Sequence, residues 1–459
     1  MKFAIAALAS IALAATPAVA EMPGDAAIRQ ILADRIDRDA ANVGIAVAVI
    51  EDGVARFVSH GTLAGAGSAA VDAHTVFEAG SITKVMTNLL LAQMVADGQI
   101  DLDAPLTDYL PAGTVLPERA GKAITAFDLA THSAGFSGLP EALLARGGDN
   151  PYSGFDAAAL FDWIGSYQLT RGIGEQFEYS NVGTALLAQA ITHVSGQDFA
   201  TLLQSRILDP LDMDETSLAL ASGPVPQLAT GHDAGGTAVP HWDFDAFAPA
   251  GALRTTASDL AKFIAAASGT ADGDFGRAAF DLMLARTRPA GGGDEKIGLG
   301  WFILPTADSD IVWHNRITGG FRSFAGFERG SGDGVVVLSN MVTTAGIEDI
   351  GLHLLDEAIP LRAQPERRAV AAIDPAILPA YAGDYLLAPG VTISVTTEGA
   401  RTYVQLTGQQ KFEIFPESER RFFFRVVDAQ ITFSDPLEGA APALILHQNG
   451  QNMTAIRLP

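Results

Sequence analysis

The sequence of 459 residues contains no cysteine. This absence excludes disulfide bonds, thiol nucleophiles and thiolate ligands to metals. A chain of this length must therefore be stabilised by its hydrophobic core, and any covalent catalysis must use another nucleophile.

Basic residues are also scarce. Lysine and arginine number 29 against 53 aspartate and glutamate residues, which gives a formal net charge of -24. The sequence shows no basic patch, no phosphate-binding glycine loop and no internal repeat. The charge argues against nucleic acid as a partner and is typical of a well-solvated surface.

After the first twenty residues, no apolar stretch has the length of a membrane span. Residues 4–15 are apolar, follow Lys2 and precede Ala18-Val19-Ala20, which has the small-residue form that signal peptidase cuts. We expect residues 1–20 to be a signal peptide cut after Ala20. The mature protein is then periplasmic or secreted, with no stable membrane span.

Helical and strand patterns interleave from residue 21 to residue 362, which predicts an α+β domain with an antiparallel sheet. Residues 44–50 and 54–59 flank a Glu51-Asp52-Gly53 turn, as in a hairpin. Further strands are expected at 300–304, 324–328 and 334–338, and helices at 26–41, 81–95, 182–194, 257–267 and 347–359.

The composition changes after residue 362. Residues 363–379 contain several prolines and charges and read as a linker. Beyond them, short alternating stretches lie between turn signals such as Glu398-Gly399 and Asn449-Gly450. Residues 380–459 are therefore predicted to form a small all-β, antiparallel, barrel-like domain.

Ser81 and Lys84 stand three positions apart at the expected start of a helix. Residues i and i+3 share a helix face, so the hydroxyl and the amine are expected to converge. The positive end of the helix dipole favours the negative charge that develops when a serine attacks a carbonyl. In isolation, Ser-x-x-Lys is also found on ordinary amphipathic helices.

Two further stretches carry candidate groups. Tyr179-Ser180-Asn181 precedes an apolar helix and places a phenol and an amide on a loop. A tyrosine next to an ammonium group can accept and pass on a proton. In residues 313–324, a polar run containing His314 ends at the pair Gly319-Gly320, where a strand edge can supply an oxyanion donor. Each stretch alone is also compatible with a purely structural role.

Together the three stretches resemble the serine β-lactamases of class C and their relatives, the DD-peptidases and esterases of the penicillin-recognising fold. The resemblance rests on motif order and on neighbouring segments, and it runs from residue 25 to residue 360. The matching segments are Phe77-Glu78-Ala79-Gly80-Ser81-Ile82-Thr83-Lys84, Tyr179-Ser180-Asn181, His314-Asn315-Arg316, Thr318-Gly319-Gly320-Phe321, residues 124–135 and residues 251–259.

This resemblance implies a sheet flanked by helices together with a helical subdomain, and an acyl-serine mechanism without metal or cofactor. Ser81 is the implied nucleophile, and Lys84 and Tyr179 share proton transfer, with either as the general base. The implied oxyanion donors are the backbone N–H groups of Ser81 and Ile317. The implied substrate-binding residues are Asn181, which would bind an acyl-side amide, His314, Arg316, Thr318 and Asn340.

Two departures from the family pattern affect the expected substrate. His314 stands where many β-lactamases have lysine, so a fixed positive charge is lost or becomes pH-dependent. Arg316 stands where glycine is expected, and it either narrows the cleft or binds a substrate carboxylate. Arg322 is a second candidate cation.

Residues 380–459 resemble, more loosely, the lipocalin-like domain that is appended to some of these hydrolases, beginning at Tyr381-Ala382-Gly383-Asp384-Tyr385. We therefore expect an exported serine hydrolase that cleaves a β-lactam or a D-alanyl peptide through an acyl-Ser81 intermediate. The alternatives are a carboxylesterase of the same family and a penicillin-binding protein without turnover. The sequence assigns a small-molecule or peptide substrate and no oligomeric state.

Overall fold

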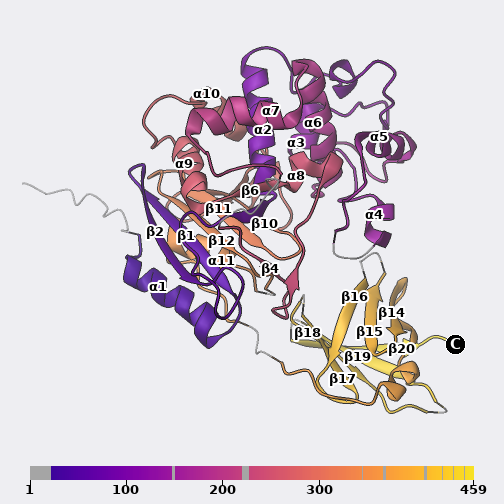
Figure 1. The fold of residues 1–459 in the computed structure, drawn as a ribbon. Coiled ribbons are helices and arrows are strands. Elements are labelled where there is room, and N and C mark those ends of the chain that lie inside the picture. The colour runs from indigo at the N-terminus through magenta and orange to yellow at the C-terminus, as the bar shows by residue number, and fades with distance from the viewer. Residues whose placement is uncertain are drawn as a thin grey trace, which may run out of the picture.

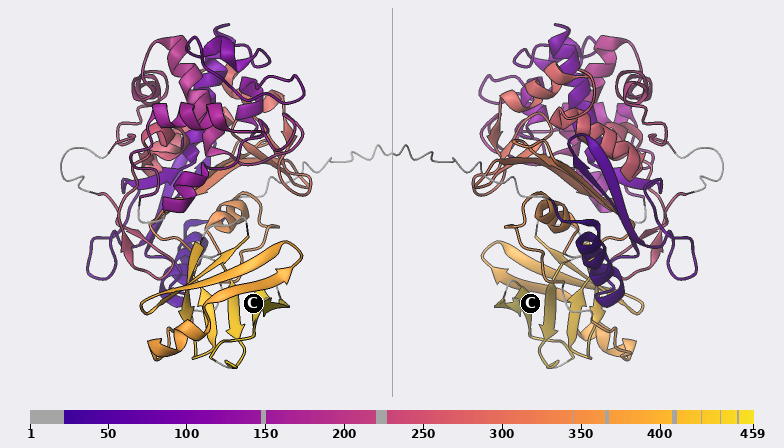
Figure 2. Two further views of the ribbon diagram at one scale, coloured as in Figure 1. Left: turned by 90° about the vertical axis from the view of Figure 1, so that its right-hand side faces the viewer. Right: turned by 90° about the vertical axis from the view of Figure 1, so that its left-hand side faces the viewer.

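The computed structural model describes residues 22–146, 150–219, 227–343, 345–364, 368–407, 411–425, 427–437, 439–448 and 450–459. They form a large domain of helices around a sheet and a separate β-barrel beside it (Figures 1 and 2). The predicted signal peptide lies outside the described residues. Within the described residues, no helix combines the length and the apolar character needed to cross a bilayer.

The large domain is built on an antiparallel sheet of eight strands in the order β2-β1-β12-β11-β10-β9-β8-β7. The strands are β1 (Gly44–Glu51), β2 (Val54–Gly61), β7 (Arg288–Pro289), β8 (Lys296–Ile297), β9 (Phe302–Pro305), β10 (Asp310–Ile317), β11 (Arg322–Glu328) and β12 (Gly334–Ser339). The predicted α+β class is confirmed.

Helices cover both faces of this sheet (Figure 1). Successive strand residues point to opposite faces, and both faces of the inner strand β1 are covered, so residues 44–50 of this strand are all buried and carry no polar side chain. One set of its side chains packs with α1 (Asp25–Ala33) and α11 (Glu348–Leu355), and the other set packs with α9 (Ala257–Ser268).

A helical subdomain covers the face of the sheet that packs with α9. Its centre is α2 (Ile82–Ala96), whose first eleven residues are all buried because the sheet and other helices enclose it. The sequence predicts a helix over residues 81–95, and the enclosing elements bury its polar residues, including Lys84, Thr87 and Asn88, together with its apolar ones. The other helices are α3 (Ala126–Ala130), α4 (Glu141–Arg146), α5 (Ala157–Ser166), α6 (Asn181–Ser195), α7 (Phe199–Leu203), α8 (Ala248–Gly251) and α10 (Arg277–Ala285).

The C-terminal domain is a closed antiparallel barrel, which confirms the predicted all-β class. An eight-stranded barrel has an interior just wide enough for side chains to fill, and here Tyr381, Tyr385, Phe422 and Phe433 occupy it. The domain therefore resembles a lipocalin only in that its strands close into a barrel. The strands are β13 (Gly383–Ala388), β14 (Val391–Glu398), β15 (Arg401–Leu406), β16 (Lys411–Pro416), β17 (Arg421–Phe424), β18 (Ala429–Phe433), β19 (Ala443–Gln448) and β20 (Gln451–Arg457).

Three element boundaries differ from the sequence-based expectation. The first helix changes to a π-helical turn at residues 34–38. Helix α11 ends at Leu355 because Asp356 is extended (φ -150°). The end of the predicted linker forms a 3-10 helix, Pro375–Ala380, whose Leu378 is buried in the barrel core.

Asp128 is a buried carboxylate in α3 that joins this helix to the sheet. Its carboxylate accepts hydrogen bonds from Thr125, which caps α3, and forms an ion pair with Arg288 of β7 at 2.8 Å. The side chain of Asp128 is 1% exposed. Removing one partner of a buried ion pair leaves the other charge uncompensated.

Replacing Asp128 by alanine should lower the free energy of unfolding by about 3–5 kcal/mol. The control is Asp156→Ala at α5, an exposed cap that accepts a hydrogen bond from Ala159 and should contribute about 1 kcal/mol. Urea denaturation followed by tryptophan fluorescence measures this domain alone, because all four tryptophans lie in it. Equal losses in the two variants would contradict the role of the buried pair.

Candidate active site

Ser81 lies at the junction between strand β3 (Phe77–Gly80) and helix α2. Gly80 before it has a φ of 53°, and a Cβ on this residue would lie 3.0 Å from Cγ of Arg316. Only glycine accepts both conditions without strain. The sharp turn leaves Ser81 at the N-terminus of the helix, where backbone N–H groups lack intrahelical acceptors.

Lys84 is directed at the hydroxyl of Ser81. Its Nζ lies 2.7 Å from Ser81 Oγ and 2.6 Å from the carbonyl oxygen of Ala250 in α8. Ser81 Oγ also donates to that carbonyl, at 3.2 Å. The predicted contact between Ser81 and Lys84 is present. The contact of both residues with Ala250 could not be predicted from the sequence, because any residue type can supply a backbone carbonyl.

Burial governs the protonation of Lys84. Desolvation lowers its pKa well below the usual value, and the nearby positive charge of Arg316 acts in the same direction. A neutral amine can accept the Ser81 proton across the same short contact. The environment thus favours the form of lysine that serves as a base.

Tyr179 lies between the side chains of Lys84 and Arg316. Its ring centroid is 4.9 Å from Lys84 Nζ and 5.0 Å from Arg316 Cζ. Burial raises the pKa of Tyr179, while the positive charge of Arg316 opposes that rise. Within the described chain its buried hydroxyl has no hydrogen-bond partner, so it is available to a substrate group.

Two neutral histidines pack around Tyr179. The ring of His132 lies 4.4 Å from the Tyr179 ring, and its Nδ1 accepts a hydrogen bond from the backbone of Ser180. Burial lowers the pKa of His314 to about 3, and its Nδ1 lies 2.7 Å from the carbonyl oxygen of Asn315. His314 is therefore uncharged at ordinary pH and does not replace the positive charge of a lysine.

The free edge of β10 faces the nucleophile. Strand β9 pairs with β10 only as far as Trp313, so the following residues have one open edge. Thr318 donates its backbone N–H to Phe321 on the β11 side, at 3.0 Å. Along a strand, successive backbone N–H groups point to opposite sides. The N–H of Ile317 therefore points away from β11, toward the open edge of β10 and the cavity that Ser81 also lines.

Arg316 is the unpaired cation of the cleft. It lines the same cavity, and within the described residues no carboxylate forms an ion pair with it. Arg322, the second candidate, is paired with Glu348 at 3.0 Å, and Asn315 binds the same carboxylate. Adjacent strand residues point to opposite faces of the sheet, which explains why Asn315 contacts Glu348 while Arg316 lines the cavity.

The remaining candidate residues separate into two groups. Asn181 begins α6, lines the cavity and donates from Nδ2 to the hydroxyl of Tyr152 at 3.0 Å. Thr318 also lines the cavity. Asn340 is buried elsewhere, where its amide binds the backbone carbonyls of Thr62 and Leu63. The structure thus brings together all the candidates except Asn340 and Arg322.

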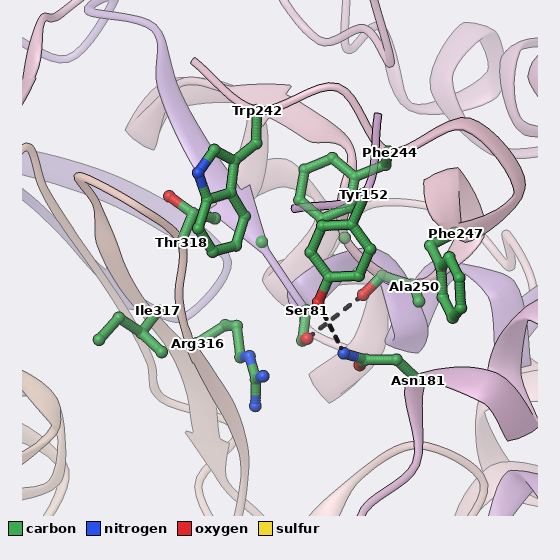
Figure 3. Close-up of a pocket in the computed structure, with 12 residues that line it drawn as sticks. Ser81, Tyr152, Asn181, Trp242, Phe244, Phe247, Ala250, Arg316, Ile317 and Thr318 are labelled. Carbon is green, nitrogen blue, oxygen red and sulfur yellow. Dashed lines mark hydrogen bonds between the residues drawn. The ribbon is translucent and has the colours of Figure 1, made fainter. Parts of the chain in front are cut away.

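The cavity at Ser81 is small, with a volume of about 10 Å³, which is room for about one water molecule (Figure 3). Four of its lining residues, Tyr152, Trp242, Phe244 and Phe247, were not identified from the sequence. They lie in loops without periodicity, so only their clustering in the fold reveals them. Among the described residues, no group of three or more histidine, aspartate or glutamate side chains could hold a metal ion.

A family model for β-lactamases matches residues 25–358, which is most of the chain. The chain belongs to the β-lactamase family. A second model, for a domain of unknown function (DUF3471), matches residues 367–456. The family relationship extends over the whole catalytic cleft and confirms the resemblance inferred from the motifs.

Curated relatives include penicillin-binding protein 4* of Bacillus subtilis (strain 168), which is 26% identical over 84% of this chain and 88% of its own length. The β-lactamase of Escherichia coli (strain K12) is 26% identical over 65% of this chain and 84% of its own. AmpH of the same organism, a D-alanyl-D-alanine-carboxypeptidase/endopeptidase, is 29% identical over 40% of this chain and 48% of its own. The protein is accordingly a serine hydrolase.

Solved structures share the fold. The octameric penicillin-binding protein homologue from Pyrococcus abyssi has a TM-score of 0.64 and 21% identity, with 94% of this chain and 99% of that chain covered. The β-lactamase/D-alanine carboxypeptidase from Yersinia pestis has a TM-score of 0.60 and 22% identity, with 73% and 97% covered.

Replacing Arg316 by glutamine should shift the acid limb of the kcat/KM profile to higher pH. We expect activity to rise with pH as Lys84 loses its proton, and the charge of Arg316 lowers the pKa of Lys84. Without that charge, Lys84 holds its proton to a higher pH. The profile should be measured with an uncharged p-nitrophenyl ester, and the exposed Arg29→Gln serves as control. An unmoved limb would contradict the coupling between these two residues.

Proposed function

We propose that this protein is an exported hydrolase that forms an acyl intermediate on Ser81 and acts on a β-lactam or a D-alanyl peptide. The observation that carries the proposal is the buried 2.7 Å contact between Lys84 Nζ and Ser81 Oγ, adjacent to the unpartnered hydroxyl of Tyr179. Export rests on the signal-peptide features of residues 1–20.

In the acylation step, Ser81 Oγ attacks the substrate carbonyl and its proton passes to the pair formed by Lys84 and Tyr179. The oxygen of the tetrahedral intermediate lies between the N–H groups of Ser81 and Ile317. The proton then moves to the leaving nitrogen or oxygen as its bond to carbon breaks. In deacylation, the same pair removes a proton from a water molecule, and the resulting hydroxide attacks the acyl ester. The bond between the acyl carbon and Ser81 Oγ then breaks, and the pair returns the proton to Ser81 Oγ.

Arg316 supports an anionic substrate. A guanidinium binds carboxylates through paired hydrogen bonds, and this one has no internal carboxylate partner in the described chain. The names of two relatives, penicillin-binding protein 4* and D-alanyl-D-alanine-carboxypeptidase/endopeptidase AmpH, point to substrates that carry such a group. The neutral His314 leaves this task to Arg316.

A carboxylesterase of the same family is the second candidate. It is favoured by the uncharged His314 and by the aromatic side chains of the cavity, both of which suit a substrate without charge. A penicillin-binding protein without turnover is the third reading, since the side chain of Arg316 lies against Gly80 and narrows the cleft.

The deciding experiment incubates the mature protein with benzylpenicillin and with a chromogenic cephalosporin, while hydrolysis and intact mass are followed together. We expect turnover or a drug-sized mass increase in the wild type and neither in Ser81→Ala. The matched control, Ser166→Ala at an exposed serine, should behave as the wild type. Turnover indicates a β-lactamase, and a lasting adduct indicates a penicillin-binding role. Full activity in Ser81→Ala would overturn the catalytic assignment.

Replacing Arg316 by glycine should lower kcat/KM for a carboxylate-bearing substrate by roughly ten- to a hundredfold, because a charge-assisted hydrogen bond contributes about 1.5–3 kcal/mol. A matched methyl ester should lose much less. Arg29→Gly is the control for loss of one surface charge. A gain with the anionic substrate would instead show that Arg316 obstructs the cleft.

A further inference from the structure

His132 contacts four consecutive residues of the loop that carries Tyr179. Its ring centroid lies 4.4 Å from that of Tyr179 and 5.9 Å from that of Phe177. Its carbonyl oxygen accepts the backbone N–H of Glu178 at 2.8 Å, and its Nδ1 accepts that of Ser180 at 3.3 Å. The residue before Tyr179 and the residue after it are thus both hydrogen-bonded to His132.

His132 is itself held by helix α3. Its backbone N–H donates to the carbonyl oxygen of Leu129 at 3.1 Å, and the N–H of Ser133 donates to the carbonyl oxygen of Asp128 at 2.8 Å. The side chain of Asp128 joins α3 to the sheet through its ion pair with Arg288. His132 therefore gives the loop a support that is fixed both to the helical subdomain and to the sheet.

The backbone of His132 adopts a left-handed conformation, with a φ of 52°. Residues with a side chain seldom do this, although histidine and asparagine are found there more often than most types. Such conformations persist where the surrounding structure fixes them, and they gather at functional sites. At this position, the carbonyl oxygen and the imidazole of one residue both contact the same loop.

The imidazole of His132 is neutral, and its hydrogen bond fixes the tautomer. The residue is 4% exposed, and burial lowers its pKa well below the usual value. Since Nδ1 accepts the N–H of Ser180, the single proton of the ring lies on Nε2. A neutral ring can pack on Tyr179 without adding a charge to the site.

The phenol of Tyr179 depends on such a support. Within the described chain, its hydroxyl has no hydrogen-bond partner. The position of this oxygen relative to Ser81 is therefore set by the backbone on either side of Tyr179 and by the rings that pack against it. Proton transfer requires the two heavy atoms to lie within hydrogen-bond reach, so a displacement of about 1 Å lowers the rate strongly.

We propose that His132 is a positioning residue for Tyr179, which holds the phenol in place for proton transfer during the acylation of Ser81. This inference rests on the proposed function and adds to it a residue that acts through Tyr179 rather than on the substrate. Core packing alone would explain a buried ring. It would not require hydrogen bonds from one residue to the neighbours of Tyr179 on both sides.

The test mixes an excess of enzyme with an uncharged p-nitrophenyl ester and follows the release of p-nitrophenol, which reports the acylation of Ser81. The limiting rate constant at saturating enzyme does not depend on the fraction of folded enzyme, which changes only the concentration at half-saturation. His132→Gly suits the left-handed backbone but removes the imidazole, and it should lower the limiting rate constant roughly ten- to a hundredfold. His132→Asn keeps an acceptor, Oδ1, in the place of Nδ1 and should stay within about fivefold of the wild type.

Asp212→Gly is the matched control, because Asp212 is exposed and also left-handed, with a φ of 52°, at the end of the 3-10 helix Asp209–Leu211. It should keep the wild-type rate constant. An unchanged limiting rate constant in His132→Gly would reduce His132 to a structural role and overturn the proposal. Equal losses in His132→Gly and His132→Asn would also overturn it, because asparagine keeps the acceptor.

If His132→Gly does not fold, Phe177→Leu takes its place, since it removes the ring that packs edge-on against the imidazole. It should lower the limiting rate constant about threefold or more, whereas Phe275→Leu, at a half-buried ring that packs against Phe280, should not. Equal rate constants in these two variants would overturn the proposal. If the wild type releases p-nitrophenol no faster than Ser81→Ala, the proposed function itself fails and the positioning role with it.

Discussion

The contact between Lys84 and Ser81 is the constraint on which the rest of the active site depends. An amine serves as a base near neutral pH only if its charged form is disfavoured, and burial does this most strongly. The fold accordingly encloses α2 on all sides and gives the amine two acceptors, Ser81 Oγ and the Ala250 carbonyl. The cost of burying an amine is offset by the surrounding core.

Arg316 makes the cleft positive in a protein whose formal net charge is -24. Its guanidinium lies over Tyr179, lowers the pKa of Lys84 and has no carboxylate partner in the described chain. One side chain thus affects the protonation of Lys84 and, in the proposed function, also binds the substrate. His314 is neutral, so the charge that many relatives place at that position is moved two residues along the strand.

Much of the fold could be predicted from periodicity and turn signals, because local patterns report which face of an element is buried. The hairpin of β1 and β2, helices α6 and α9 and the barrel class agree with expectation. The predictions failed where contacts between residues far apart in the sequence determine which side chains are buried. Leu378 joins the barrel core although its neighbours read as linker, and α2 is buried on faces that the pattern left polar.

The sequence by itself determined the family and singled out Ser81, Lys84 and Tyr179 as candidates, because three motifs in order define a family and helical spacing brings i and i+3 together. Only the tertiary structure decided that Asn340 lies apart, that Arg322 is neutralised by Glu348, and that Ala250 and four aromatic rings complete the cleft. Those groups come from segments far apart in the chain, and their roles follow from proximity, burial and charge, which no local pattern encodes.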